Sequence, residues 1–251
     1  MSEMKKNAET KFSRQIEFKI FRYKPNCVGP SRYDSFKLDV TSDMVVLDCL
    51  EKIRLKQDDT LMYRHSCHHS ACGTCALIIN GSERLACITR VLELKSKSVV
   101  LEPLRRFKLL GDLVVDMSSF YEHIDPDWSL LKPVEPLPNK TSLFLTQSSI
   151  PIRRLENCIE CGACISACPA MRSFSKFMGP AALAAIACQM QKVSSKERKV
   201  LLKFANGPNG QRICDRRFVC SRVCPTQVYP ARQIADLRKL LGLPKRKKAT
   251  K

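Results

Sequence analysis

The chain has 251 residues, which is enough for two domains of roughly 100–150 residues each. Hydrophobic residues make up 44% of it, so the composition excludes a disordered tail protein. No run approaches ~18 consecutive apolar residues, and we therefore expect a soluble or peripheral protein without a transmembrane helix. The formal net charge of +19 fits three kinds of partner: nucleic acid, an anionic membrane surface or an acidic subunit.

Residues 1–14 predict a flexible N-terminus without the apolar segment of a secretory leader. The fourteen cysteines of the chain therefore indicate a reducing compartment and metal ligation rather than disulfide bonds. The basic residues are scattered, except for a run in a predicted basic tail over residues 244–251.

Residues 15–108 predict a small domain of short strands around one helix, an arrangement typical of a β-grasp fold. Asn80-Gly81 is the strongest short hairpin signal in it. A helix would begin at a cap supplied by Ser42 or Asp43. The apolar stripe of this helix is Val46, Leu47, Leu50 and Ile53. The expected strands are 16–23, 36–40, 76–79, 84–86 and 98–101.

Four cysteines in this domain follow the spacing C-x4-C-x2-C, with the fourth after eleven more residues. This is the plant-type spacing of a 2Fe–2S cluster. The small residues Ser70, Ala71 and Gly73 let the backbone of the loop approach the sulfides. A zinc site is the alternative, but zinc favours paired C-x2-C knuckles and has no use for the x4 arm. The four residues are Cys67, Cys72, Cys75 and Cys87.

Three histidines, His65, His68 and His69, flank these cysteines. Because the thiolate spacing already completes the ligand set, we expect the imidazoles to shield the site or to hydrogen-bond to it. They are not predicted to be cluster ligands.

Residues 109–144 are expected to connect this domain to a second one. A helix is predicted to begin at Gly111 and to run through Tyr121. The prolines between Pro126 and Pro138 predict an extended linker behind it.

Residues 145–243 predict an all-helical domain that contains two short cysteine loops. Pro180 and Pro230 each stand at an expected helix start, and Gly242 marks an expected helix end. The predicted helices are 180–190, 194–205 and 230–242.

Two cysteine runs in this second domain have the spacing of a two-cluster ferredoxin. The first, C-x2-C-x2-C-x3-C-P, extends from Cys158 to Pro169, and its fourth cysteine ligates the other cluster. The second, C-x5-C-x3-C-P, extends from Cys214 to Pro225 and has Arg217 where a complete four-iron set would have a cysteine. A three-iron cluster is the natural occupant of the second site. A four-iron cluster with some other ligand stays open as the alternative.

With both cysteine sets in order, the chain resembles the iron–sulfur subunit family of succinate dehydrogenase and fumarate reductase. The resemblance extends from Phe18 to about Leu243. It is carried by eleven cysteines in order and by four further motifs. These are Arg64-His-Ser-Cys67, Leu85-Ala-Cys87, Asp112-Leu-Val-Val-Asp116 and Met178-Gly-Pro180-Ala-Ala.

The fold class expected from the elements and the resemblance together is α+β. An N-terminal β-grasp, plant-type ferredoxin domain would be followed by an all-α, bacterial-ferredoxin-like domain. The resemblance implies that Cys67, Cys72, Cys75 and Cys87 hold 2Fe–2S, that Cys158, Cys161, Cys164 and Cys224 hold 4Fe–4S, and that Cys168, Cys214 and Cys220 hold 3Fe–4S. Of the remaining cysteines, Cys49 and Cys188 are predicted to be small core residues and Cys27 a loop thiol.

Members of the family that reduce ubiquinone carry a tryptophan a few residues after the first Cys-Pro and a histidine after the first cysteine of the second run. The matching residues here are Ser173 and Asp215, and the single tryptophan, Trp128, lies elsewhere in the sequence. The quinone-facing side chains of the family therefore do not carry over. Pro169, Asp215 and Arg217 are candidates for lining a quinone edge. For Arg217, capping a helix or pairing with an acid stays open as the alternative.

The resemblance implies an electron-transfer subunit of succinate dehydrogenase (succinate:quinone oxidoreductase). Electrons would pass from the FAD of a partner flavoprotein through the 2Fe–2S, 4Fe–4S and 3Fe–4S clusters to a membrane quinone. The chain shows no dicarboxylate site of its own, because it carries no Rossmann glycine fingerprint, P-loop or catalytic triad.

A fumarate reductase subunit that runs the same path in reverse is the alternative within the family. A basic, nucleic-acid-binding iron–sulfur protein is an alternative from another class. No helix-turn-helix or RNA-binding signature is visible, however, so no nucleic-acid partner is expected. The expected partners are the flavoprotein, one or more membrane anchor subunits and a quinone. The sequence start lacks an Arg-rich, acid-free leader, which favours a peripheral position on the cytoplasmic face of the inner membrane, or on the matrix face in a eukaryote.

Overall fold

The computed structural model describes residues 13–25, 30–124 and 157–243. The chain divides into two compact units, which are described separately below. The sheet unit contains the described residues up to 103 together with 109–114, and the helical unit contains 104–108 and the described residues from 115 onward. Several predicted features lie outside the described residues: most of the N-terminal tail, Cys27, Trp128, the proline-rich linker, residues 145–156 of the second predicted domain and the basic tail.

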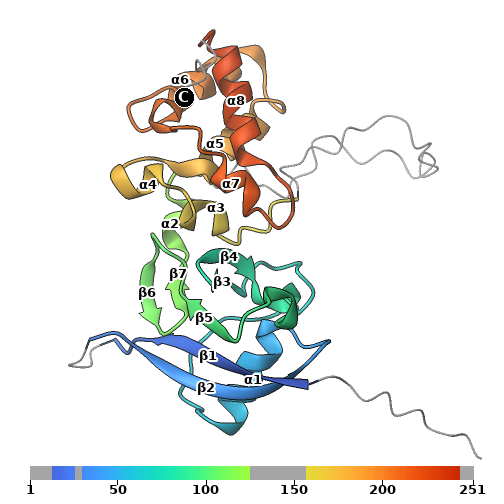
Figure 1. Cartoon of the computed structure of the whole chain (residues 1–251). Coiled ribbons are helices and arrows are strands. Elements are labelled where there is room, and N and C mark those ends of the chain that lie inside the picture. Colours follow the sequence, from blue (N-terminus) through green and yellow to red (C-terminus); the bar gives the residue numbers. More distant parts are fainter. Residues whose placement is uncertain (1–12, 26–29, 125–156, 244–251) are drawn as a thin grey trace, which may run out of the picture. The chain divides into compact units, whose positions relative to one another are not determined.

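The sheet unit is built on five strands in the order β2-β1-β5-β3-β4 (Figure 1). Its two longest strands are antiparallel neighbours, and Phe18 stands opposite Phe36 in their register. The strand β5 runs parallel to β1, whereas β3 pairs antiparallel with both β4 and β5. All five predicted strands, including the hairpin through Asn80-Gly81, are therefore confirmed. Their bounds are β1 (Ser13–Arg22), β2 (Arg32–Thr41), β3 (Ala76–Ile79), β4 (Ser82–Leu85) and β5 (Ser98–Glu102).

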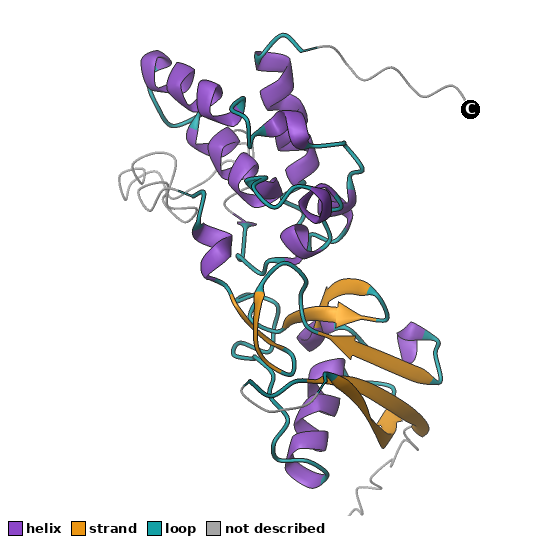
Figure 2. Cartoon of the chain, turned by 90° about the vertical axis from the view of Figure 1, so that its left-hand side faces the viewer, coloured by secondary structure: helices purple, strands orange, loops and turns teal. Residues whose placement is uncertain are grey.

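The helix α1 (Val46–Lys56) lies beside this sheet (Figure 2). It buries the four residues of the predicted apolar stripe and also Cys49. The predicted cap at Ser42 or Asp43 is wrong, because those residues form a turn that ends β2. The helix starts after Val45, whose N–H donates to the Asp48 carboxylate at 2.9 Å. Two short 3-10 helices, η1 (Ala86–Ile88) and η2 (Leu92–Leu94), follow β4.

The predicted helix from Gly111 through Tyr121 is wrong over most of its length. The structure has a two-stranded sheet of β6 (Lys108–Gly111) and β7 (Val114–Asp116), and only α2 (Ser118–Tyr121) is helical. The turn between the strands holds Asp112 at a φ of +32°. Its carboxylate accepts hydrogen bonds from the backbone N–H groups of Tyr23 (2.8 Å) and Met62 (2.9 Å). These partners are distant in sequence, so local helical periodicity could not reveal the turn.

The helical unit is organised around α5 (Gly179–Gln189), which packs against α8 (Pro230–Leu240) (Figure 1). Every residue of α5 from Gly179 to Cys188 is buried. The three long predicted helices are confirmed, and α6 (Ser195–Ala205) begins with a capping box between Ser194 and Glu197. The shorter elements are α3 (Ala163–Ser166), α4 (Ala170–Ser173), η5 (Gln211–Ile213) and α7 (Val219–Arg222).

The order of the two units confirms the coarse prediction of a sheet region followed by a helical region.

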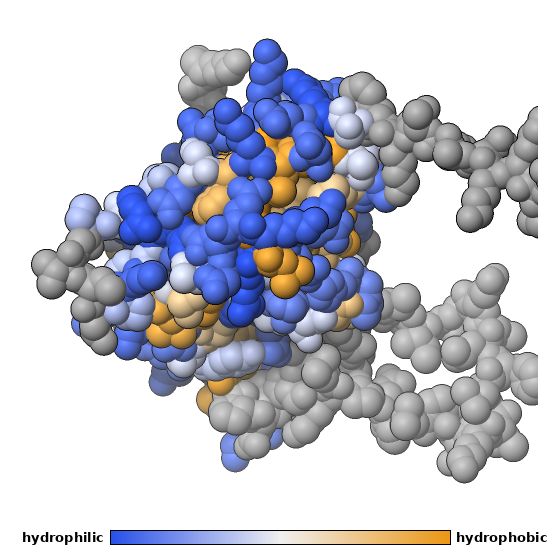
Figure 3. All heavy atoms as spheres, turned by 90° about the horizontal axis from the view of Figure 1, so that it is seen from below, coloured by the Kyte–Doolittle hydropathy of each residue, from blue (hydrophilic) through white to orange (hydrophobic). Residues whose placement is uncertain are grey.

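Hydrophilic side chains dominate the face shown in Figure 3, and apolar side chains interrupt them in separate groups. Within the described residues, no helix has both the length and the apolar character needed to cross a bilayer.

Candidate metal centres

The first cysteine set lies in a loop that wraps its backbone around sulfur. The N–H groups of His69, Ala71 and Cys72 are directed at Cys67 Sγ from 3.5, 3.3 and 3.3 Å. The N–H of Ser70 donates to Cys87 Sγ at 3.3 Å, which joins the loop to the cysteine after β4. Cys67 and Cys72 also share a side-chain hydrogen bond, as do Cys75 and Cys87. The structure therefore brings all four predicted residues of this set together.

Left-handed backbone makes this wrapping possible. His68, Ser70 and Gly73 have φ values of +61°, +62° and +69°. Alternating left-handed residues turn successive N–H groups to one side and form a concave anion-binding surface. A cluster with thiolate ligands is negatively charged. The thiols of this loop can ligate such a cluster, and the surrounding N–H groups can stabilise its charge.

The thiols of this set differ sharply in acidity. Hydrogen bonds from the backbone N–H groups, first that of His69, lower the pKa of Cys67 to about 7. Burial raises the pKa of Cys75 to about 12. Metal ligation requires thiolates, so binding of iron here must displace at least the Cys75 proton.

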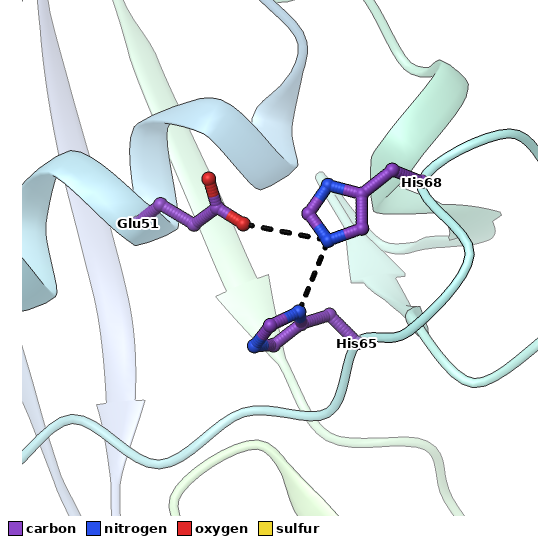
Figure 4. Close-up of side chains that lie close together, drawn as sticks. All are labelled: Glu51, His65 and His68. Carbon is purple, nitrogen blue, oxygen red and sulfur yellow. Dashed lines mark hydrogen bonds and ion pairs between the residues drawn. The ribbon is translucent and has the colours of Figure 1, made fainter.

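The three flanking histidines separate into two groups. His69 follows the prediction, because its N–H is directed at Cys67 Sγ and its ring Nδ1 contacts the Cys67 carbonyl oxygen. His65 and His68 instead lie against each other, with Nδ1 and Nε2 3.1 Å apart (Figure 4). Glu51 of α1 completes this group.

The second cysteine set lines one small cavity of about 30 Å³ in the helical unit. The rest of its lining is mostly apolar and includes Phe120, Ala181 and Ala184, the last two from the buried helix α5. Glu160 and Gly162 between the cysteines have φ values of +52° and +78°, so this loop also uses left-handed backbone. Four sulfur donors in an apolar enclosure suit a four-iron cluster. They are Cys158, Cys161, Cys164 and Cys224.

Burial makes two thiols of this set less acidic. It raises the pKa of Cys158 to about 12 and the pKa of Cys164 well above its ordinary value. Cys224 Sγ accepts a hydrogen bond from the N–H of Val228 at 3.3 Å and also lies 3.8 Å from the Thr226 hydroxyl oxygen. Without a metal, the thiols of Cys158 and Cys164 would remain protonated at neutral pH.

The third set, Cys168, Cys214 and Cys220, also converges. Burial raises the pKa of Cys220 to about 12, and the neighbouring thiols of Cys168 and Cys214 add to this rise. The three thiols therefore lie close to one another. Arg216 and Phe218 between the last two cysteines have φ values of +59° and +61°. The same alternation of left-handed residues thus recurs in all three loops.

The predicted quinone-edge residues line one surface pocket of about 720 Å³ beside this third set. Arg217 Nε lies 3.4 Å from Asp215 Oδ2, so the alternative in which Arg217 pairs with an acid describes a contact that the structure contains. Sequence reasoning missed Arg172 and Arg222, which line the same pocket. Their positions next to the cysteine runs were the available signal. The predicted residues in this lining are Pro169, Asp215 and Arg217, with Ser173 beside them.

Comparisons with known proteins agree with this arrangement. A family model described as "2Fe-2S iron-sulfur cluster binding domain" matches residues 17–122, and one described as "4Fe-4S dicluster domain" matches residues 154–228. The mitochondrial "Succinate dehydrogenase [ubiquinone] iron-sulfur subunit 1" of Oryza sativa subsp. japonica is 31% identical over 229 residues, covering 89% of this chain and 81% of the relative. The chain belongs to the succinate dehydrogenase iron–sulfur subunit family. The corresponding mitochondrial subunit of Candida glabrata is 30% identical over 240 residues and covers 93% and 94% of the two chains.

Solved structures show the same fold. A chain of the "Mycobacterium smegmatis Sdh1 complex in the apo form" superposes with a TM-score of 0.75 at 22% identity, covering 95% of this chain and all of that one. A hypothetical protein from Helicobacter pylori gives a TM-score of 0.56 at 21% identity and covers 94% and 41% of the two chains.

These findings confirm the family resemblance and its central implication. The chain is an electron-transfer subunit of succinate dehydrogenase, an oxidoreductase, and it contains 2Fe–2S and 4Fe–4S binding domains. The fumarate reductase alternative is not favoured, because the relatives are named as succinate dehydrogenase subunits.

Proposed function

We propose that this chain carries electrons from the FAD of a partner flavoprotein to a membrane quinone through three clusters in series. The observation that carries the proposal is the convergence of three separate cysteine sets, each in a loop with left-handed backbone. A single cluster would suffice to pass electrons over a short distance. Three clusters in series suit electron transfer over a longer distance.

The ligands follow the three sets. Their backbone and burial environments support a division into 2Fe–2S, 4Fe–4S and 3Fe–4S, since the third set offers only three thiolates and position 217 is Arg. The proposed ligands are Cys67, Cys72, Cys75 and Cys87 for the first cluster, Cys158, Cys161, Cys164 and Cys224 for the second, and Cys168, Cys214 and Cys220 for the third.

The protein would tune these sites through its own groups. The clusters, when bound, supply one-electron redox chemistry. Backbone N–H groups aimed at Cys67 Sγ stabilise added negative charge at the first site, and the apolar walls around Cys158 and Cys164 disfavour it at the second. Arg217 near the third set would favour the reduced, more negative state of that site.

The quinone edge is proposed at the pocket that contains Pro169, Asp215 and Arg217. The family tryptophan and histidine are replaced here by Ser173 and Asp215, so the pocket would bind its quinone through other groups. Arginine side chains can donate to a quinone carbonyl and can also stabilise the charge of a reduced quinone.

The proposed assembly contains the flavoprotein and one or more membrane anchor subunits, and the chain would be peripheral to the membrane. The proposed face is the cytoplasmic side of the inner membrane, or the matrix side in a eukaryote. Within the chain, we assign the sheet unit to the β-grasp ferredoxin type and the helical unit to the bacterial ferredoxin type. The proposed domain bounds are residues 15–108 and 145–243, joined by 109–144.

A cysteine exchange tests the three-iron assignment. In the Cys220→Ser variant of the assembled complex, the electron paramagnetic resonance (EPR) signal of an oxidised three-iron cluster should disappear, and quinone reduction by succinate should stop. Cys49→Ser is the matched control, because Cys49 is also a buried cysteine but lies in α1, outside the three sets. A three-iron signal that survives Cys220→Ser would contradict the assignment.

Arg217→Leu tests the electrostatic role. We expect a lower midpoint potential of the three-iron cluster in an EPR titration, since a cation that stabilises the reduced state is removed. An unchanged or higher potential would rule out that role.

Steady-state rates test the direction of transfer. The complex should oxidise succinate with a dye faster than it reduces fumarate with a reduced quinol. Mass spectrometry of proteins that co-purify with the chain would identify the flavoprotein and the anchor.

A further inference from the structure

A group of side chains that carry potential metal-ligand atoms lies on the sheet unit, outside the three cysteine sets. It contains Glu51 of α1 and the two histidines His65 and His68 of the following loop (Figure 4). His65 Nδ1 lies 3.1 Å from His68 Nε2, and His68 Nε2 lies 3.6 Å from Glu51 Oε1. The three potential ligand atoms all lie within 4.8 Å of one another.

These separations match the edge of a zinc coordination tetrahedron. Two ligands about 2.0–2.1 Å from a zinc ion at the tetrahedral angle lie roughly 3.3 Å apart. The separations of 3.1 and 3.6 Å fall on either side of this value. The remaining pair of ligand atoms lies within 4.8 Å, so rotation of the side chains would bring all three to one ion.

The local structure positions each of these three side chains. The ring of His65 stacks on Tyr63 with centroids 5.3 Å apart and an interplanar angle of 30°. Glu51 is anchored in the middle of α1, a helix with five buried residues. His68 has a left-handed backbone, with φ +61°, which turns its ring toward the other two.

We propose that Glu51, His65 and His68 form a site for a zinc-type divalent cation with an open fourth position. Two imidazoles and one carboxylate are a donor set that zinc accepts when a water takes the remaining place. Both histidines are exposed, so an ion and its water can enter from solvent. The proposal does not depend on the electron path, because no cysteine contributes to the site.

The competing interpretation is a hydrogen-bonded group that binds only a proton. A protonated His68 would pair with Glu51 and contact His65 without any metal. Zinc binding by the intact protein separates the two interpretations.

The experiment is equilibrium dialysis of the full chain, with its clusters assembled, against zinc, followed by measurement of zinc and iron per chain. We expect one zinc per chain in addition to a full complement of iron, and no binding of magnesium, which prefers oxygen ligands. His65→Gln, His68→Gln and Glu51→Gln should each weaken zinc binding by at least about tenfold, because even outer-shell partners of a metal site contribute about 10–100-fold.

His123→Gln is the matched control, since His123 is a histidine of the helical unit and lies outside the group. It should leave zinc binding unchanged. Zinc that binds only in proportion to missing iron, or that is equally weakened by His123→Gln, would overturn the proposal. The same holds if no zinc binds to the iron-replete chain.

Discussion

At the scale of single residues, the sheet unit contains a buried ionic group. The side chain of Arg22 is only 3% exposed and that of Asp112 only 1%. Arg22 Nε lies 3.1 Å from Asp112 Oδ1, and the same guanidinium pairs with Asp58. The Asp112 carboxylate also accepts hydrogen bonds from two backbone N–H groups. It therefore connects the end of β1, the loop after α1 and the β6–β7 turn.

Asp112→Ala should lower the free energy of unfolding by about 3–5 kcal/mol, because it leaves a buried guanidinium without one of its carboxylates and two N–H groups without an acceptor. Thermal unfolding of the iron-replete chain measures the effect. Asp59→Ala, at an exposed aspartate, should have an effect within about 0.5 kcal/mol. Equal effects of the two changes would contradict a special role for Asp112.

The acidity of the cysteines at the first site gives a second prediction. In the iron-free chain at pH 7, Cys67 with a pKa of about 7 should be alkylated by iodoacetamide at least about a hundredfold faster than Cys75, whose pKa is about 12. A rise to pH 9 should speed Cys67 only about twofold, since half of it is already thiolate, and Cys75 about a hundredfold. Mass spectrometry of the labelled peptides gives both rates.

Cys49 is the internal control for that measurement, because burial also raises its pKa to about 12 and it lies outside the cluster sets. Labelling of Cys67 and Cys49 at similar rates would contradict the proposed effect of the backbone N–H groups.

At the scale of elements, local sequence signals predicted most of the fold. The apolar stripe of α1, the Asn80-Gly81 hairpin and the proline starts of α5 and α8 all arise from neighbouring residues. The region from Gly111 to Tyr121 was predicted wrongly, because its turn depends on partners at Tyr23 and Met62. In the same way, cysteine spacing predicted which residues converge, whereas the group of Glu51, His65 and His68 depends on how the loop after α1 folds back beside that helix.

Glycine at position 162 is favoured for two reasons. Its φ is +78°, and an added Cβ would lie 2.9 Å from Phe107 Cζ and 3.0 Å from Met117 Cε. Gly162→Ala should therefore lower the four-iron EPR signal and the iron content of the chain, and lower stability by more than the ~1–2 kcal/mol of left-handed strain alone.

The Gly81→Ala variant separates the effect of backbone strain from the effect of side-chain crowding. Gly81 has nearly the same φ, +77°, but no atom within 4 Å of an added Cβ. This variant should lose stability through strain and keep its iron. Loss of iron in both variants to the same extent would show that crowding at Gly162 is unimportant.

At the scale of the whole molecule, several of the proposed cluster ligands of the helical unit lie in or against its hydrophobic cores. Cys168 lies in the core with Phe177, Leu183 and Ile234, and Cys158 and Cys224 pack against Ala184 and Cys188. Thiols are smaller than most apolar core side chains, and we expect the proposed clusters to fill the space that they leave.

Removal of iron by a chelator should therefore loosen the helical unit. We expect the amides of α5 and α8 to lose protection in hydrogen-exchange measurements, since both helices carry walls of the second site. The amides of β1, whose buried side chains Ile16, Phe18 and Ile20 belong to the sheet core, should keep more of theirs. Retained protection in α5 after complete iron loss would contradict a structural role for the clusters.

The spacing of the cysteines also sets an order of maturation during synthesis. All four cysteines of the first set lie between Cys67 and Cys87, so this site is complete once the sheet unit has left the ribosome. The second set cannot close until Cys224 has been made, long after Cys158. Until then, the proposed second site has no metal to fill its apolar cavity. We expect cells with limited iron to accumulate chains that carry only the first cluster, and newly made protein to be most vulnerable to proteases in its helical unit.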